Sequence, residues 1–267
     1  RYGDTNALKR IYNSIMIRGE FVIAISKFIA DDIQSRYQIE DDTLKIIPRG
    51  ADISLFNPED ASQQAANRLI KEWGVPDDTP VIMLPARLTR WKGHEILIEA
   101  LSLIKDVRFF CVLVGDHDTK KTYRSELEKI IKFQGLTNKV KITGHCKDMV
   151  SAYKISDIVI SASLDPEPFG RITVEAQAMG CLVVAADHGG ARETIQHNRT
   201  GILVEPRNSE ALADGIKKAL EMKTEDRTSM GIAAREFVSS NFSRETMCYR
   251  TMSLYCQLLD LNPQLNS

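Results

Sequence analysis

The sequence is poor in cysteine, and its cysteines show no pairing pattern. Five cysteines are spread through 267 residues, the number is odd, and no C-x-x-C motif is present. A disulfide framework usually needs an even number of cysteines at regular spacings, so that class of protein is excluded and a reducing compartment is expected. The five histidines do not pair with cysteines at zinc-ligand spacing, so no structural metal is expected.

The sequence also lacks an excess of charge and a long apolar run. Lysine and arginine total 35 and aspartate and glutamate total 36, which gives a net charge of -1 and no basic surface for nucleic acid. No apolar segment approaches the roughly 20 residues that span a bilayer, and no secretory signal opens the chain. Hydrophobic residues make up 43% of the chain, enough for a buried core. These features predict a globular cytoplasmic protein.

Short apolar runs alternate with segments of helical period along most of the chain. The runs are apolar at consecutive positions, which indicates strands buried on both faces of a parallel sheet. The intervening segments, such as Glu95–Ile104 and Ser125–Phe133, carry apolar residues at helical spacing. Repeated strand–helix units predict a doubly wound, Rossmann-like α/β domain. The predicted strands are residues 21–25, 45–47, 81–84, 109–114, 140–142, 158–160 and 182–185, and the predicted final helices are residues 209–221, 225–239 and 243–260.

One stretch, Asp165–Ala176, combines a proline-rich acidic loop with the start of a helix. Its two prolines disfavour helix, Gly170 then permits close backbone approach by a ligand, and helical spacing resumes directly afterwards. Within one helix, Glu167 and Glu175 would lie about 12 Å apart, but with Glu167 in the loop they can converge on one ligand. Backbone N–H groups at such a helix start favour phosphate. A helix cap with two solvated glutamates fits the spacing equally well.

A second stretch, Ala86–Gly93, is a basic loop between a predicted strand and a helix. Arg87 and Lys92 would both project from it, and two cations suit a diphosphate, arginine as a fork and lysine as a point charge. An ordinary basic surface loop is the alternative.

Three shorter motifs also follow predicted strands. The glycine pair in His188–Glu193 could bring backbone amides to a ligand or form a plain tight turn, and Gly144–Asp148 could clasp a nucleobase. The D-x-D sequence Asp116–Asp118 could bind a metal, although a surface turn is the favoured interpretation. Because the basic loop, the acidic loop and the glycine pair fall at one edge of the predicted sheet, we expect a phosphorylated ligand there.

These residues resemble a known family. Pro85–Gly93, Asp165–Gly180 and Gly189–Glu193 are similar to the C-terminal half of retaining glycosyltransferase family 4, which has the GT-B architecture of two Rossmann-like domains. The Glu-x7-Glu signature of that family is met by Glu167 and Glu175. The resemblance implies a sugar transferase that uses a UDP- or GDP-sugar, needs no metal or other cofactor, and does not bind nucleic acid.

The resemblance also implies a set of site residues. Glu167 is implied as the catalytic residue that holds the transferred sugar with nearby amides, and Glu175 as the ligand of the ribose hydroxyls. Arg87 and Lys92 would hold the donor diphosphate, and the amides of two further residues would reach the phosphate. The implied donor set is Arg87, Lys92, Phe169, Gly170, Arg171, Ile172, Thr173, Glu175, Gly189, Gly190 and Glu193, with Gly144, His145 and Lys147 at the nucleobase.

The resemblance further divides the chain into three parts. Residues 1–55 are expected to be the end of an acceptor domain with the interdomain segment, residues 56–240 the donor-binding domain, and residues 241–267 a helix that crosses back to the acceptor domain. The resemblance implies that most of an acceptor domain lies outside this chain, so a non-catalytic nucleotide-sugar-binding fragment is the alternative function. The apolar residues of the final helix are then expected to be partly exposed, namely Met247, Met252, Leu254, Tyr255 and Leu258.

Acceptor and location are implied only in outline. Family members build lipopolysaccharide, capsule or other glycans, which suggests a glycan or lipid-linked acceptor and a place at the cytoplasmic membrane face. Ala7–Arg18 could be a basic amphipathic anchor, but a helix packed on the core through its apolar residues is favoured. Arg49 and Arg192 depart from the family, which commonly has asparagine and proline at these positions.

Overall fold

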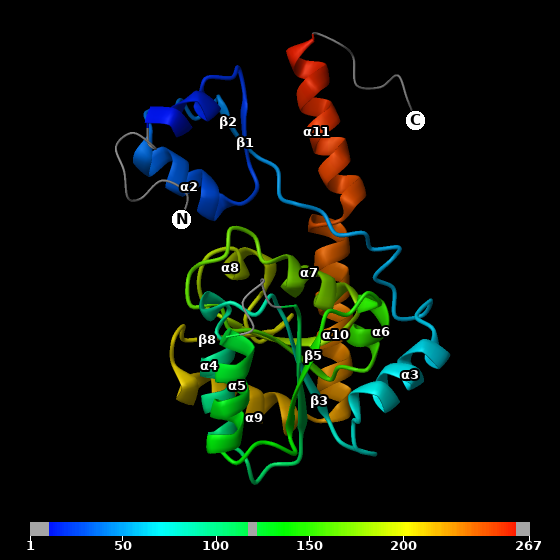
Figure 1. Ribbon diagram of the computed structural model, residues 1–267. Coiled ribbons are helices and arrows are strands. Elements are labelled where there is room, and N and C mark those ends of the chain that lie inside the picture. The colour runs from blue at the N-terminus through cyan, green and yellow to red at the C-terminus, as the bar shows by residue number, and fades with distance from the viewer. Residues whose placement is uncertain (1–10, 117–121, 260–267) are drawn as a thin grey trace.

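The computed structural model describes residues 11–116 and 122–259, and within them the chain forms two separate parallel sheets. Figure 1 shows the larger sheet inside the main body and the smaller one set apart from it, near the N-terminal end. The strand order of the larger sheet is β5-β4-β3-β6-β7-β8, and all its neighbouring strands are parallel. Its strands are β3 (Val81–Pro85), β4 (Phe110–Val114), β5 (Val140–Gly144), β6 (Ile158–Ser161), β7 (Leu182–Ala186) and β8 (Ile202–Val204).

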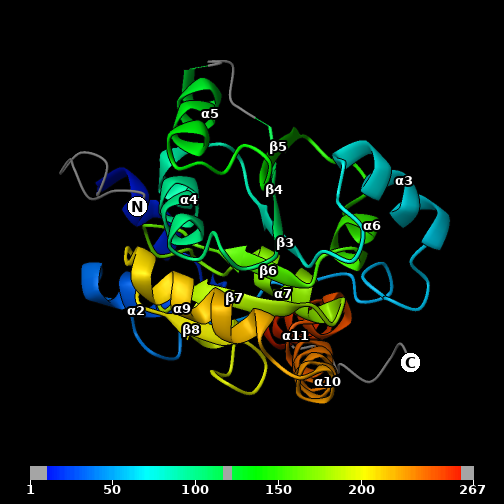
Figure 2. The same cartoon turned by 90° about the horizontal axis from the view of Figure 1, so that it is seen from below.

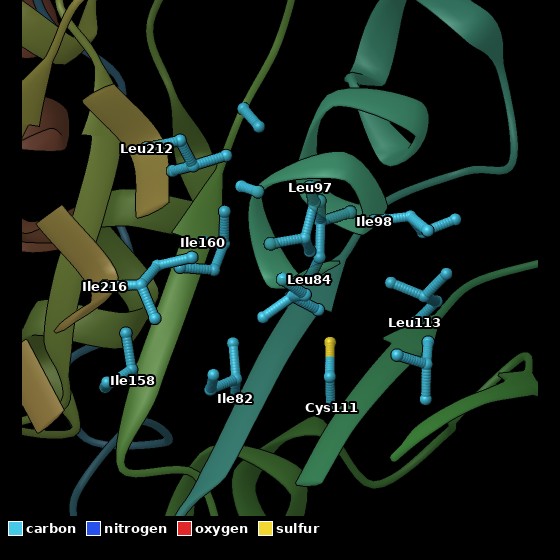
Figure 3. Packing of buried hydrophobic residues seen from close by; sticks show 14 of the residues in the cluster. Ile82, Leu84, Leu97, Ile98, Cys111, Leu113, Ile158, Ile160, Leu212 and Ile216 are labelled. Carbon is cyan, nitrogen blue, oxygen red and sulfur yellow. The ribbon is translucent and has the colours of Figure 1, made fainter. Parts of the chain in front are cut away.

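Helices cover both faces of the six-stranded sheet (Figure 2). On one face lie α4 (His94–Leu103), α5 (Thr122–Phe133) and α9 (Ser209–Leu220); on the other lie α3 (Gln63–Trp73), α6 (Met149–Lys154), α7 (Arg171–Ala178) and α10 (Thr224–Asn241). Successive strand residues point to opposite faces of the sheet, so the same strands contribute side chains to the hydrophobic core on each face. Figure 3 shows the first layer, where strand residues meet helix residues: Ile82, Leu84, Ile158 and Ile160 against Leu97, Ile98, Leu212 and Ile216.

Strands β3 and β6 are neighbours, although β4 and β5 lie between them in the sequence. From β3 the sheet continues to one edge through β4 and β5, and from β6 it continues to the other through β7 and β8. The strand order therefore reverses between β3 and β6. In open parallel sheets, ligands bind in the crevice outside the carboxyl ends of the strands at such a switch point.

Gly93 lets the loops that follow β3 and β6 come into contact. Its φ is 75°, in the left-handed region, and a Cβ at this position would overlap the carbonyl oxygen of Ala162. Two residues from this contact in each loop, the backbone N–H of Leu164 donates to the carbonyl of Trp91 at 2.7 Å. The two loops are thus joined through their backbones, and only glycine fits at the closest point.

The smaller sheet belongs to a unit of its own. It consists of β1 (Val22–Ala24) and β2 (Leu44–Ile46), connected by α2 (Lys27–Arg36), and its buried residues are Val22, Ala24, Ala30 and Leu44. A segment without regular structure leads from β2 to the main body. There Ala51 donates to the carbonyl of Phe242 and accepts from the N–H of Arg244, each at 2.8 Å. These bonds hold the segment at the junction of α10 and α11 (Arg244–Leu258).

Most predicted elements are present. Each predicted strand overlaps an observed one, and the bounds differ by at most two residues at either end. The elements that were not predicted are short: α6, β8, α8 (Ala191–Thr194) and the 3-10 turn η2 (Arg90–Lys92). The 3-10 turn η1 (Ser14–Ile17) lies within the helix expected over Ala7–Arg18. Such elements hold too few residues to show a period.

The expected packing of the segment before β1 is wrong for its described residues. Ile11 and Ile15 are 69% and 65% exposed rather than packed on a core. Among the described residues before β1, only Ile17 packs against the small core around Val22. Ile29 and Ile33 of α2 also pack against that core. Leu8, the first apolar residue of the expected face, lies outside the described residues.

The expected exposure of the final helix is confirmed in part. Met252 and Tyr255 are 59% and 50% exposed, whereas Leu254 is buried. Figure 1 shows α11 rising from the main body toward the same end as the small unit. Met247 and Thr251 of α11 line one cleft with Ile23 and Ile25 of the small unit.

The close approach at Gly93 gives a test of the fold. Gly93→Ala must place a methyl group on the carbonyl of Ala162, whereas Gly135→Ala has the same left-handed φ, 73°, with nothing within 4 Å. Both variants incur the left-handed cost of about 1–2 kcal/mol, and Gly93→Ala should lose about 1–3 kcal/mol more from overpacking. Urea denaturation of both proteins measures the difference. Equal losses would show that the loops do not meet at Gly93.

Candidate functional site

An ion pair joins the two loops at the switch point. Lys92 Nζ, after β3, lies 2.7 Å from Glu167 Oε1, after β6, and the two side chains are only 11% and 15% exposed. The hydroxyl of Ser163 donates to the same carboxylate oxygen. The two charged residues that the sequence assigned to a diphosphate and a sugar are therefore brought together, and each neutralises the other.

The rest of the basic loop lies around this pair. Lys92 Nζ sits 4.2 Å from the ring centroid of Trp91, which is a cation–π contact. Arg87 lies two residues after the end of β3 and is exposed. Both cations of the predicted diphosphate site thus stand at the carboxyl end of β3.

The acidic loop ends in the N-terminus of α7. Gly170 caps this helix with φ 85°, a conformation that favours glycine. Phe169 is buried against the ring of Phe242, with centroids 5.7 Å apart. Arg171 is exposed, and the N–H of Thr173 donates to the Gly170 carbonyl at 3.1 Å. The helix start thus follows the acidic loop beyond the carboxyl end of β6, with Ile172 half-buried in its first turn.

Glu175 lies one turn into α7 and is 7% exposed. Its carboxylate accepts hydrogen bonds from Tyr153 Oη at 3.1 Å and from Arg171 Nε at 2.9 Å. Burial raises the pKa of Tyr153 well above its usual value, so this hydroxyl stays neutral and donates. Glu175 and Arg171 line a cleft of about 580 Å³, whose opposite wall includes Arg49 and Asp52 of the connecting segment.

Tyr153 was missed by the sequence analysis. It lies on α6, twenty-two positions before Glu175, and also packs edge-on against Phe56, with ring centroids 5.8 Å apart. A tyrosine on the apolar face of a short helix is an ordinary core residue in sequence. No sequence signal connects it to Glu175.

The glycine pair packs against the acidic loop. A Cβ on Gly189 would overlap the backbone of Glu167, and one on Gly190 would overlap that of Phe169. The N–H of Gly190 donates to the carbonyl of Glu167 at 2.8 Å, and His188 Nε2 lies 2.8 Å from the carbonyl of Ser163. These residues support the loop that carries Glu167.

Glu193 bonds to the small unit. Its two carboxylate oxygens accept the backbone N–H groups of Lys27 and Phe28, each at 2.8 Å, at the start of α2. That Glu193 binds the nucleotide sugar stays a prediction. In this structure its carboxylate accepts hydrogen bonds from the backbone of α2 instead.

The remaining predicted residues lie away from the ion pair. Gly144 ends β5, two strands from β3, with His145 and Lys147 exposed beyond it. In the D-x-D sequence, only Asp116 lies within the described residues. In residues 11–116 and 122–259, no group of three or more His, Cys, Asp or Glu side chains could hold a metal ion. No helix of that part of the chain has the length and apolarity to cross a membrane.

The parallel sheet and its two layers of helices define a Rossmann-like α/β protein, with the Lys92–Glu167 pair at the switch point between β3 and β6. Residues 66–237 match the family model described as Glycosyl transferases group 1. The chain belongs to this family.

Known proteins similar to this chain agree in fold. A glycosyltransferase from Rickettsia africae is 38% identical with a TM-score of 0.91, covering 97% of this chain and 69% of that chain. The Anabaena protein HepE, solved with UDP and glucose, is 31% identical with a TM-score of 0.85, covering 93% and 66%. The D-inositol 3-phosphate glycosyltransferase of Corynebacterium glutamicum is 29% identical over 92% of this chain, which spans 60% of that relative. The fold is that of the GT-B glycosyltransferases.

His94, directly after Gly93, is fully buried at the start of α4, and its ring meets that of Tyr123 edge-on at 6.1 Å. Burial lowers the pKa of His94 to about 4, so it is neutral at pH 7. The unfolded chain, with a pKa near 6.5, binds the proton first as the pH falls. As the pH falls from 6.5 to 4, the burial of neutral His94 therefore lowers the free energy of unfolding, by about 3 kcal/mol at pH 4.

Replacing this imidazole should flatten the pH dependence. In His94→Leu, the free energy of unfolding should fall about 3 kcal/mol less than in the wild type between pH 7 and pH 4. Urea denaturation at several pH values measures both curves. Parallel curves would mean that His94 titrates normally in the folded protein.

Proposed function

We propose that this chain is the donor-binding part of a retaining glycosyltransferase that moves a sugar from a nucleoside diphosphate sugar to a glycan or lipid-linked acceptor. The observation that carries the proposal is the Lys92–Glu167 pair at the switch point. It combines a cation suited to a diphosphate with a carboxylate suited to sugar hydroxyls, on adjoining loops, in a chain of a transferase family. Family membership supports the enzyme over a non-catalytic binding fragment.

The proposed chemistry follows from where charge develops. As the bond between the sugar carbon and the diphosphate oxygen breaks, negative charge grows on the leaving diphosphate. Arg87, Lys92 and the N–H groups at the start of α7 would stabilise that charge without a metal. Glu167 would hold the sugar while the acceptor oxygen replaces the diphosphate at the sugar carbon with the configuration retained, and the proton of the acceptor hydroxyl would leave with the diphosphate.

Glu175 would bind the ribose. Its carboxylate is held by Tyr153 and Arg171 at the wall of the 580 Å³ cleft. A carboxylate fixed in this way can accept both hydroxyls of a ribose ring. The base would lie beyond it, toward Gly144, His145 and Lys147 at the carboxyl end of β5.

We infer that the donor is a UDP-sugar. HepE, 31% identical, was solved with UDP and glucose, which supports uridine as the base. GDP is the alternative and an outcome of the test below. The acceptor, a role in cell-envelope glycan synthesis and a place at the cytoplasmic membrane face rest on the resemblance to family 4.

The proposed domain division follows the same resemblance. Residues 56–240 would bind the donor, residues 1–55 would belong to the acceptor side, and residues 241–267 would connect back to it. The separate two-stranded sheet and the bonds of Ala51 at the start of α11 support this division.

Nucleotide binding tests the proposal directly. By titration calorimetry, the chain should bind UDP more tightly than GDP. Lys92→Ala should weaken UDP binding by roughly 10- to 150-fold, because a charge-assisted hydrogen bond contributes about 1.5–3 kcal/mol. Lys217→Ala removes an exposed lysine of α9 and serves as the matched control. A chain that binds neither nucleotide would contradict the proposal, and tighter GDP binding would reverse only the choice of base.

A further inference from the structure

Helix α2 begins with hydrogen bonds to a residue far away in the sequence. The first N–H groups of a helix have no partner within it and are satisfied by a capping side chain or by other groups, among which negative charge suits the helix dipole. The first turn of α2 contains no acidic residue of its own.

Every N–H of this first turn has a partner. Lys27 and Phe28 donate to the two carboxylate oxygens of Glu193, each at 2.8 Å, and Ile29 donates to the hydroxyl of Ser26 at 3.1 Å. Two of these three partners thus come from a residue 165 or more positions later in the chain. The negative charge that suits the helix dipole is supplied by the main body.

The same helix start also touches the acidic loop. Ser26 is fully buried, and its hydroxyl donates to the carbonyl of Pro168 at 2.5 Å. Pro168 directly follows Glu167. We call Glu193, Ser26 and the amides of Lys27 and Phe28 the α2 clamp.

The clamp connects to the carboxylate at the switch point through backbone alone. Glu193 lies on α8, which begins directly after Gly190. The N–H of Gly190 bonds to the carbonyl of Glu167, and no side chain larger than hydrogen fits at Gly189 or Gly190. A shift of the acidic loop on donor binding must therefore move α8, and with it the carboxylate of Glu193.

We propose that Glu193 is a positioning residue that fastens the small unit to the donor loops and does not contact the donor. This inference rests on the proposed function, in which a nucleotide sugar binds beside Glu167 and the acceptor side includes the small unit. Donor binding would then change the hydrogen bonds between Glu193 and the first N–H groups of α2. Glu193 thereby sets how the two sides of the reaction face one another.

Amide hydrogen exchange followed by NMR tests the clamp without any knowledge of the acceptor. In Glu193→Gln, an amide replaces the carboxylate, so one of its two atoms can no longer accept. The amides of Lys27 and Phe28 should exchange at least about tenfold faster than in the wild type, while UDP affinity changes less than about threefold. Glu193→Asp keeps the charge and should give intermediate exchange.

The positioning role needs a second readout, namely the response to donor. Saturating UDP-glucose should slow exchange of the Lys27 and Phe28 amides in the wild type by about threefold or more, and this slowing should vanish in Glu193→Gln. Glu210→Gln, which changes an exposed first-turn acid of α9, should behave as the wild type. Should Glu193→Gln not fold, Ser26→Ala tests the other half of the clamp in the same way.

The outcomes separate the clamp from the proposed function. Unchanged exchange at Lys27 and Phe28 in Glu193→Gln overturns the clamp, and a loss of UDP affinity as large as that of Lys92→Ala shows that Glu193 contacts the donor instead. Faster exchange without any response to UDP-glucose in a wild type that binds UDP overturns the positioning role. If the wild type binds no nucleotide, the proposed function fails, and the exchange rates alone still decide whether Glu193 holds α2.

Discussion

The contact between the loops after β3 and β6 is the constraint on which the site depends. Gly93 permits it, the bond from Leu164 N–H to the Trp91 carbonyl fixes it, and the Lys92–Glu167 pair lies across it. A shielded ion pair is a poor source of stability, because removing both charges from water costs about as much as their attraction returns. Its place at the switch point is therefore better explained by the ligand crevice than by folding.

Several residues of the predicted motifs hold loops together inside the protein instead of facing solvent. Gly189 and Gly190 allow α8 to press on the acidic loop, and Thr173 bonds both Gly170 and Thr194 inside the protein. Such support matters because a binding group is effective only when it is held in the right geometry before the ligand arrives. A glycine motif can thus serve a ligand without touching it.

The sequence predicted five of the six strands of the larger sheet, because most of them are apolar on both faces and are separated by helices of clear period. The same reasoning placed Lys92 and Glu167 at one edge, since parallel strands deliver their carboxyl ends together. It missed Tyr153 and the partners of Glu193, because those contacts join residues 22 and about 166 positions apart and leave no local pattern. It was wrong about Ile11 and Ile15, because periodicity shows an apolar face but not what covers it.

The charged side chains of the site are balanced in pairs, as the charges of the whole chain are balanced in number. In this structure Lys92 is paired with Glu167, and Arg171 with Glu175. Under the proposed function, the diphosphate of the donor would compete with a carboxylate for the Lys92 ammonium, so binding at Lys92 would be an exchange of partners. The carboxylate released in this way would carry a full charge in a shielded position and would need hydrogen-bond donors, which sugar hydroxyls provide. Diphosphate and sugar would then favour each other's binding, because each would satisfy the charge that the other uncovers.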